Sequence, residues 1–163
     1  MNSRERVLAA LNHKVPDRIP IDLGSFPGAT SMNVRAYQNL LEYLGIKRDV
    51  RIGALIMFTA EIDQDILDQF HVDTKTITPS RPLSDFNFPE EFLDRPWGVK
   101  WRRSTDFTYA PVEGPFQKIS NPTVEDIQKF SWPNPSEIEN FDQWREKGKR
   151  FRQETDKALV GRV

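Results

Sequence analysis

Cysteine is absent from the sequence, and its absence excludes disulfide bonds, thiolate metal ligands and thiol nucleophiles from this chain. Long apolar runs are absent too, because none reaches the roughly 18 residues that a membrane-spanning helix needs. Near its start, Arg4, Glu5 and Arg6 are charged where a secretion signal would have its apolar segment. These absences predict a cytoplasmic protein with no membrane partner.

An excess of charge of one sign is also missing. The 23 basic and 24 acidic residues give a formal net charge of -1 and are mixed along the chain. Proteins that bind nucleic acid concentrate positive charge on one face. We therefore expect no nucleic-acid partner.

Familiar catalytic and metal-binding signatures are missing as well. The sequence has no glycine-rich dinucleotide fingerprint, no Gly-x-Ser-x-Gly element and no His-Glu-x-x-His element. Its two histidines, His13 and His71, have no second histidine or cysteine at ligand spacing. We therefore expect no metal site within this chain.

Hydrophobic periodicity predicts helices and strands in mixed order, in a chain long enough for one domain. Residues 18–24, "RIPIDLG", alternate like a strand that glycine closes, although Pro20 confines it to an edge position. Residues 97–104 and 107–112 have the alternation of a β-hairpin. Helices are expected over residues 3–12, 31–44, 62–70, 123–130 and 138–151, and further strands over residues 72–77 and 158–163.

The last expected strand, residues 158–163, has no helix after it. An α/β sheet needs helices over both of its faces. This ending predicts that the chain is part of a larger fold.

The loop at residues 24–31, "GSFPGATS", is the first candidate for a ligand site. In α/β proteins ligands bind beyond the carboxyl ends of the strands, and Gly24 and Gly28 would let the backbone approach a ligand. Asp22 alternates out of phase with the apolar residues before the loop, so it faces either solvent or a polar barrel mouth. The alternative interpretation is a plain turn followed by the cap of a helix at Ser31, since the spacing of a phosphate loop is absent.

Taken in order, several segments resemble the N-terminal half of the uroporphyrinogen decarboxylase superfamily. They are "SRERVLAALNHKVPDRIPIDLG", "YQNLLEYLGI", "DILDQFHVDTKTI", "WGVKWRR", "SNPTVEDIQKFSWPNP" and "DKALVGRV". The opening motif and the Trp-Pro-x-Pro element are the more specific of these. The likeness is strongest to the methyltransferase-like branch, whose members move methyl groups between corrinoid proteins and thiols or other acceptors.

The resemblance implies an α/β fold in which residues 1–163 are the N-terminal half of a TIM (β/α)8 barrel with an inserted β-hairpin. A full barrel of this type has about 250 residues. Residues 18–24 would be its first strand, and the loop after that strand would line the barrel mouth. The substrate-binding candidates there are Asp22, Gly24, Ser25 and Phe26. The resemblance transfers no catalytic residue.

Within the superfamily, the decarboxylases place an Arg-Gln-Ala-Gly-Arg element just after the first strand, where its arginines meet substrate carboxylates. Here no arginine lies between Arg18 and Arg35. The methyltransferases bind zinc through His and Cys residues of their C-terminal half. The zinc cofactor is accordingly expected only in a completed barrel.

The leading expectation is the N-terminal portion of a zinc-dependent methyltransferase that acts with a corrinoid protein or a thiol acceptor. Its partner would be the remaining barrel half or a second chain, and the isolated chain would be inactive. One alternative is a porphyrinogen decarboxylase, a carboxy-lyase, whose carboxylate-binding groups have moved. Another is a non-catalytic half-barrel that pairs with itself or with a partner to cover its sheet edge.

Overall fold

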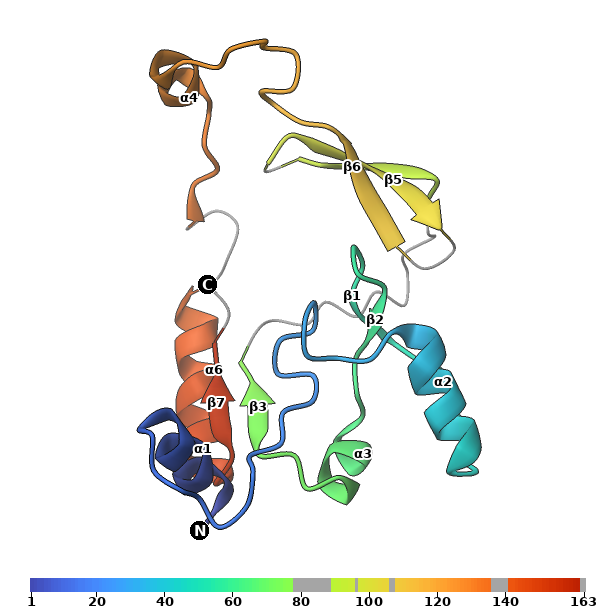
Figure 1. Cartoon of the computed structure of the whole chain (residues 1–163), viewed down its shortest axis with the longest axis vertical. Coiled ribbons are helices and arrows are strands. Elements are labelled where there is room, and N and C mark those ends of the chain that lie inside the picture. Colours follow the sequence, from blue (N-terminus) through green and yellow to red (C-terminus); the bar gives the residue numbers. More distant parts are fainter. Residues whose placement is uncertain (78–88, 96, 106–107, 136–140, 162–163) are drawn as a thin grey trace. The chain divides into compact units, whose positions relative to one another are not determined.

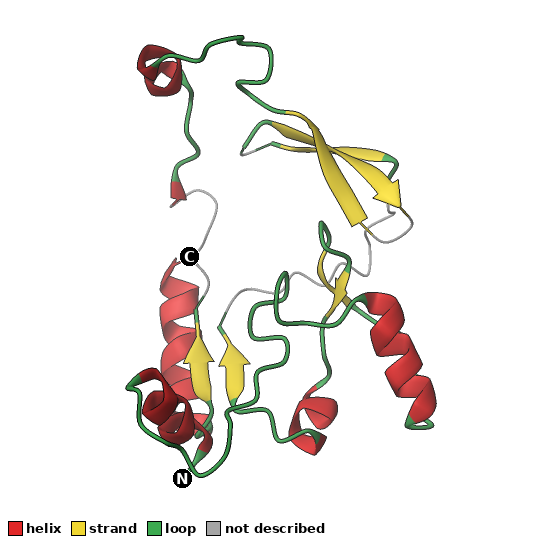
Figure 2. Cartoon of the chain, viewed as in Figure 1, coloured by secondary structure: helices red, strands yellow, loops and turns green. Residues whose placement is uncertain are grey.

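The computed structural model describes residues 1–77, 89–95, 97–105, 108–135 and 141–161. It is a mixed α/β structure with small sheets, and none of the described sheets closes into a barrel (Figure 2). The chain divides into unit 1, Met1–Phe86 with Asp142–Val163, and unit 2, Asn87–Phe141.

Unit 1 joins the two ends of the chain (Figure 1). Arg4 links them: its backbone N–H donates to the Asp156 carbonyl, and its guanidinium donates to the Thr155 carbonyl just beyond the last helix. The helices are α1 (Ser3–Leu11), α2 (Val34–Tyr43), α3 (Gln64–Gln69) and α6 (Phe141–Glu154). The strands are β1 (Ile52–Ala54), β2 (Thr59–Ala60), β3 (Thr74–Thr76) and β7 (Ala158–Val160).

Strands β3 and β7 form a parallel pair, with Thr74 opposite Ala158 and Thr76 opposite Val160. The strand expected over residues 158–163 is therefore present as β7, while residues 162–163 lie outside the described part of the chain. Parallel pairing requires a long crossover connection, which here contains all of unit 2 and α6.

The segment 18–24 is not a regular strand, contrary to the sequence prediction. It runs alongside β3 and makes a single backbone hydrogen bond there, from the Asp73 N–H to the Ile21 carbonyl at 2.8 Å. The Ile21 N–H donates instead to the Asp73 side chain at 2.8 Å, and Pro20 has no N–H to give. The Asp73 side chain thus takes the Ile21 donor that a ladder with β3 would use, and Pro20 leaves the other edge of the segment without a donor.

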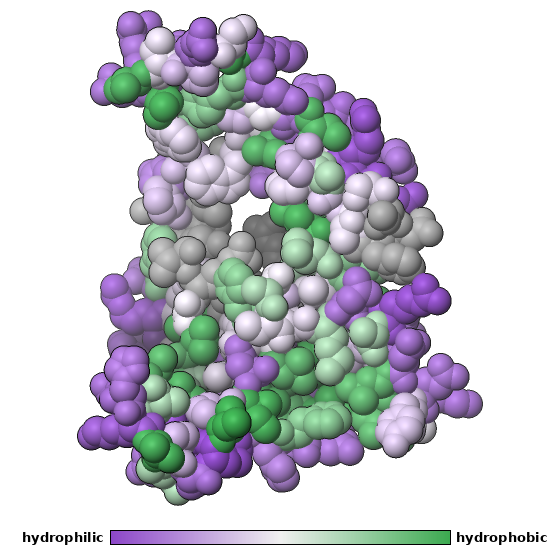
Figure 3. All heavy atoms as spheres, viewed as in Figure 1, coloured by the Kyte–Doolittle hydropathy of each residue, from purple (hydrophilic) through white to green (hydrophobic). Residues whose placement is uncertain are grey.

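Helix α1 turns a charged side chain, not an apolar one, toward the rest of unit 1. Arg6 is its buried residue, whereas Leu8 and Leu11 are 48% and 70% exposed. Leu8 and Leu11 therefore point outward, because the Arg6 side of the helix meets Asp17 and the buried Asp73. In Figure 3, hydrophobic residues lie at the surface of unit 1 between hydrophilic ones.

The compact core of unit 1 lies around α2 and α3. Tyr37 and Leu41 of α2 and Ile66 of α3 are buried. The apolar run at residues 52–58, which periodicity alone does not assign, supplies β1 and the turn into β2. Among the described residues no helix combines the length and the apolar character needed to cross a membrane.

Unit 2 contains the expected hairpin and one strand more. β5 (Val99–Thr105) pairs with β6 (Thr108–Glu113), and β4 (Glu91–Asp94) pairs with the other edge of β5, all antiparallel. Helix α4 (Val124–Lys129) begins with the capping box that the sequence indicates, Thr123 with Asp126.

The sheet of unit 2 carries a group of aromatic side chains in contact with one another and, separately, a group of ion-paired side chains. Phe92 stacks on Trp101 and meets Tyr109 edge-on. Glu91 pairs with both Lys100 and Arg102. Alternation along the strands places the rings and the charges on opposite faces.

Candidate functional site

Three segments of unit 1 lie side by side in chain order: residues 19–23, then β3, then β7 (Figure 1). Residues 19–23 and β3 are parallel, because Ile21 is bonded to Asp73 and the next residue, Asp22, is bonded to the next residue of β3, Thr74. All three segments therefore run in the same direction. The four residues proposed from the sequence lie where the first of them ends.

The position of α6 distinguishes the two faces of the β3–β7 pair. The Lys75 Nζ atom of β3 lies 4.4 Å from the centre of the Phe151 ring of α6. Side chains alternate along a strand, so Thr74 and Thr76 point to the face away from α6. Asp22 lies on that same face, because the Thr74 Oγ1 atom donates to its Oδ1 atom at 2.5 Å.

The Asp22 carboxylate is held in place from two elements. Besides the bond from Thr74, its Oδ2 atom accepts a hydrogen bond from the Ser25 hydroxyl at 2.7 Å, and its Oδ1 atom a longer one from the Ser25 N–H at 3.4 Å. Asp22 itself is exposed, whereas Ser25 and Thr74 are 3% and 7% exposed. The arrangement is an exposed carboxylate oriented by two buried hydroxyls.

The loop after Asp22 is folded on itself. Gly24 has φ +78, a left-handed conformation that costs other residues energy, and its N–H donates to the Thr30 carbonyl at 3.0 Å. The Phe26 N–H donates to the Thr30 hydroxyl at 3.0 Å. The loop therefore presents a fixed backbone, on which Phe26 is 36% exposed.

Hydroxyl groups also fasten this loop to β2. Ser31 donates to the Ala60 carbonyl at 2.5 Å, and Thr59 donates to the Pro27 carbonyl. Ser31 is not the cap of α2, contrary to the sequence prediction; Asn33 caps it, with its side chain accepting from the Arg35 N–H. The Ser31 hydroxyl is thus used to hold the loop.

A second carboxylate, Asp73, lies just before β3 and is completely buried. It forms ion pairs with Arg6 and Arg18, each at 2.7 Å. Burial works to raise the pKa of Asp73, but hydrogen bonds to its carboxylate outweigh burial and lower the pKa to about 2. These contacts attach α1 and the 19–23 segment to β3.

Sequence reasoning missed Thr74 and the Asp73 ion pairs. Thr74 lies 52 positions beyond Asp22, and Asp73 lies 67 positions beyond Arg6. No local pattern reports contacts over such distances. The alternating pattern of residues 72–77 predicts the strand that carries Thr74, but it does not predict which segments lie next to that strand.

Among the described residues, no group of three His, Asp or Glu side chains is placed to hold a metal ion. His13 and His71 end helices α1 and α3 in the left-handed conformation, with φ values of 55 and 52. They serve as helix terminators, far apart in the sequence. The described residues of this chain do not fit a zinc site.

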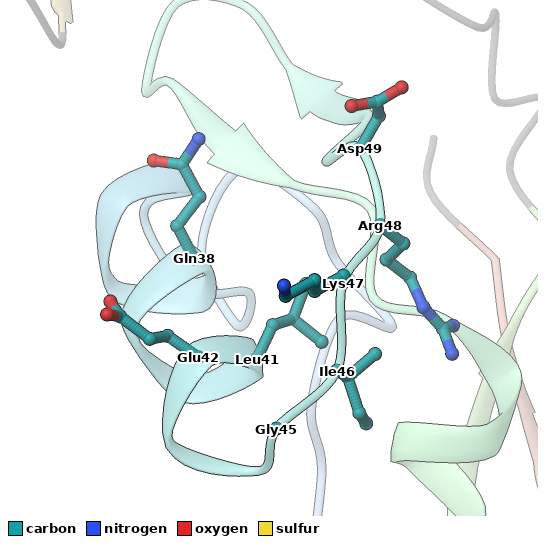
Figure 4. A pocket seen from close by; sticks show the side chains of 8 residues that line it. All are labelled: Gln38, Leu41, Glu42, Gly45, Ile46, Lys47, Arg48 and Asp49. Atoms are coloured by element: carbon teal, nitrogen blue, oxygen red, sulfur yellow. The ribbon is translucent and has the colours of Figure 1, made fainter.

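A separate groove of about 610 Å³ lies between α2 and the segment that follows it (Figure 4). Leu41 and Ile46 supply apolar surface, while Arg48 turns away to pair with Asp65 at 2.7 Å. The groove is lined by Gln38, Leu41, Glu42, Gly45, Ile46, Lys47, Arg48 and Asp49. None of the four residues proposed from the sequence lies here, and the rim carries charges of both signs.

Comparison with protein-family models, with curated proteins and with solved structures finds no match for this chain.

Proposed function

We propose that this chain is the N-terminal part of an α/β barrel of the uroporphyrinogen decarboxylase type, from a methyltransferase that acts with a corrinoid protein or a thiol acceptor. The proposal begins from the resemblance of the sequence motifs. The geometry of unit 1 adds physical support.

The observation that carries the proposal is the run of three co-directional segments, residues 19–23, β3 and β7, in chain order. In a (β/α)8 barrel the strands follow one another in this way, with helices on the outside. Here α6 meets the face that carries Lys75, while Asp22 and Thr74 share the opposite face. Asp22 is therefore placed as a residue of a barrel interior would be, near the carboxyl end of its segment.

In this proposal the chain supplies one wall of the substrate pocket. Asp22 and Ser25 contact the substrate or fix the backbone around it, Gly24 makes the turn, and Phe26 adds an apolar surface. The zinc ligands come from the part that completes the barrel, as in the methyltransferases that the sequence resembles. The second barrel half, or a second chain, is thus an obligatory partner.

The test is recovery of the chain, tagged, from its native cells together with any polypeptide bound to it. The complex is assayed for transfer of a methyl group from methylcobalamin to a thiol, followed by thioether formation. We expect transfer by the complex and none by the isolated chain. Consumption of a porphyrinogen with release of CO₂ would replace this proposal by a decarboxylase, and a stable complex without either activity would replace it by a binding module.

A further inference from the structure

We propose that Asp22, oriented by Ser25 and Thr74, is a binding site for an organic cation, an alkylammonium group of a small ligand. The inference rests on the proposed function only in taking the carboxyl edge of unit 1 as the ligand side. It adds the chemical class of the ligand, which neither the motifs nor the barrel geometry supplies.

The distribution of charge around Asp22 favours a cation. Between Ile19 and Val34 the sequence has a single charged residue, Asp22. Its neighbours on the same face of β3 and β7 are Thr74 and Thr76 with apolar residues opposite them. The described part of this face therefore carries one negative charge and no positive one, so it repels anions and attracts cations.

Asp22 has no cationic partner among the described residues. Two other exposed carboxylates of unit 1, Asp65 and Asp68, do have one: Asp65 pairs with Arg48 at 2.7 Å, and Asp68 pairs with Lys157 at 3.0 Å. Asp22 accepts hydrogen bonds from neutral groups only. Its charge is oriented by the fold but not neutralised.

The Asp22 carboxylate also has room to accept one more hydrogen bond. A carboxylate offers about four acceptor positions, and Asp22 uses three of them, one in a long bond from the Ser25 N–H. The group is exposed and held by two buried hydroxyls, so little side-chain freedom is lost when a ligand donates to it. An N–H donor on a cation forms a charge-assisted bond there.

Phe26 adds a second element suited to a cation. Its side chain belongs to the same fixed loop, next to Ser25, and is partly exposed. Aromatic faces attract ammonium groups electrostatically, and they also pack against the alkyl part of such a ligand. A metal ion is a poorer fit, since the two hydroxyls already direct their hydrogens at the carboxylate and one carboxylate alone does not make a cage.

The experiment uses the whole chain, isotope-labelled, and three probes of similar size: propylammonium, propionamide and propionate. We expect propylammonium to shift the Asp22 side-chain carboxyl carbon and the Gly24 and Ser25 amides saturably, with a dissociation constant in the millimolar range appropriate to so small a ligand. Propionamide should bind at least about fivefold more weakly, a difference set by the missing charge. Equal shifts from propionate, or no saturable shift from propylammonium, would overturn the proposal.

A pair of variants locates the site. D22N keeps the shape of the side chain and removes its charge, and it should weaken propylammonium binding about tenfold or more. D49N, which changes an exposed carboxylate on the rim of the other groove, should leave binding unchanged. If D22N does not fold, the response of the wild-type Asp22 carbon to the three probes still decides the question.

The outcome is separate from that of the methyl-transfer assay. Cation binding at Asp22 without methyl transfer would retain this site and remove the proposed function. Methyl transfer by a complex whose chain binds all three probes alike would do the reverse.

Discussion

At the scale of single residues, unit 1 contains two carboxylates that the fold uses in opposite ways. Asp73 is buried and pairs with Arg6 and Arg18. Asp22, which lies beside it in space, is exposed and bonded only to neutral groups. A buried carboxylate is stable only when it is paired, whereas an exposed one is free to be a recognition group. We therefore assign a structural role to Asp73 and a binding role to Asp22.

The first prediction concerns Asp73→Asn. The substitution removes the buried charge that Arg6 and Arg18 share, and it leaves Arg6 with Asp17 as its remaining carboxylate partner. Breaking a buried ion pair from one side costs about 3 kcal/mol or more, so we expect a large loss in the free energy of unfolding of unit 1, measured by urea denaturation. Glu113→Gln, at an exposed pair on unit 2, is the matched control and should change stability little.

The second prediction is the dependence of stability on pH. The pKa of Asp73 is lowered to about 2, and that of Asp17 is lowered further, chiefly by its hydrogen bond from Arg6. The unfolded chain binds protons at these groups before the folded chain does, so stability is full above about pH 4 and falls as the pH drops toward 2. Unfolding followed between pH 6 and 2 should show this slope, and a shallower slope in D73N. Identical slopes in the two proteins would contradict the role given to Asp73.

The sequence predicts single residues well where their role is a local conformation, and poorly where it depends on a partner far away in the sequence. Gly24 was singled out for its turn, and its φ of +78 agrees with that choice. For Arg6 the sequence gives only a charge near the start of the chain, because its partner Asp73 lies 67 positions further along. Local patterns describe conformations that a residue adopts by itself, but not partners that only the fold brings near.

At the scale of elements, the loop between residues 24 and 31 is a small structure with its own bonding rather than a passive connection. It closes through the Gly24 N–H to Thr30 bond and is fastened to β2 through Ser31. An ordered loop of this kind keeps Asp22 and Phe26 in fixed positions. The rigidity of the loop is thus part of the proposed site.

The third prediction tests that loop with two glycines. Gly24→Ala forces a side chain into a left-handed conformation, at a cost of about 1–2 kcal/mol, and its Cβ would meet the Ile62 side chain at 3.4 Å. Gly28→Ala places its Cβ where nothing lies within 4 Å, and its φ is not left-handed, so stability should stay the same or rise slightly. The melting temperature should therefore fall in Gly24→Ala and stay the same or rise slightly in Gly28→Ala. Equal decreases in the two variants would contradict the left-handed turn at Gly24.

The elements that the sequence predicted well are those with a strong repeating pattern. The hairpin of β5 and β6 and the capped helix α4 lie where alternation and the Thr123 cap place them. The segment 18–24 was predicted as a strand and is not one, because the Asp73 side chain takes the Ile21 N–H that a ladder with β3 would use. Strand β4 was not predicted, since its neighbour β5, rather than its own pattern, makes it a strand.

At the scale of the whole chain, unit 1 depends on residues from both of its ends. β3 has β7 as its strand partner, and the backbone N–H of Arg4 is bonded to Asp156 at 2.7 Å. The Arg4 guanidinium also donates to the Thr155 carbonyl at 2.7 Å. Unit 2 has its own three-stranded sheet and its own ring contacts. Sequence reasoning placed the hairpin as an insertion, but the dependence of the first residues on the last ones follows from no local pattern.

The final prediction separates the two units by deleting residues 141–163. This removes α6 and β7, so β3 loses its strand partner and the Arg4 guanidinium loses its carbonyl acceptors. Three strands with an apolar face are the minimum for a stable small sheet, and unit 2 keeps all three of its own. In amide spectra we therefore expect residues 1–77 to lose their dispersed signals while the β4–β5–β6 sheet keeps its own. If residues 1–77 stay folded without the last helix and strand, then β7 is not what completes unit 1, and the run of co-directional segments that supports a half-barrel has no physical role.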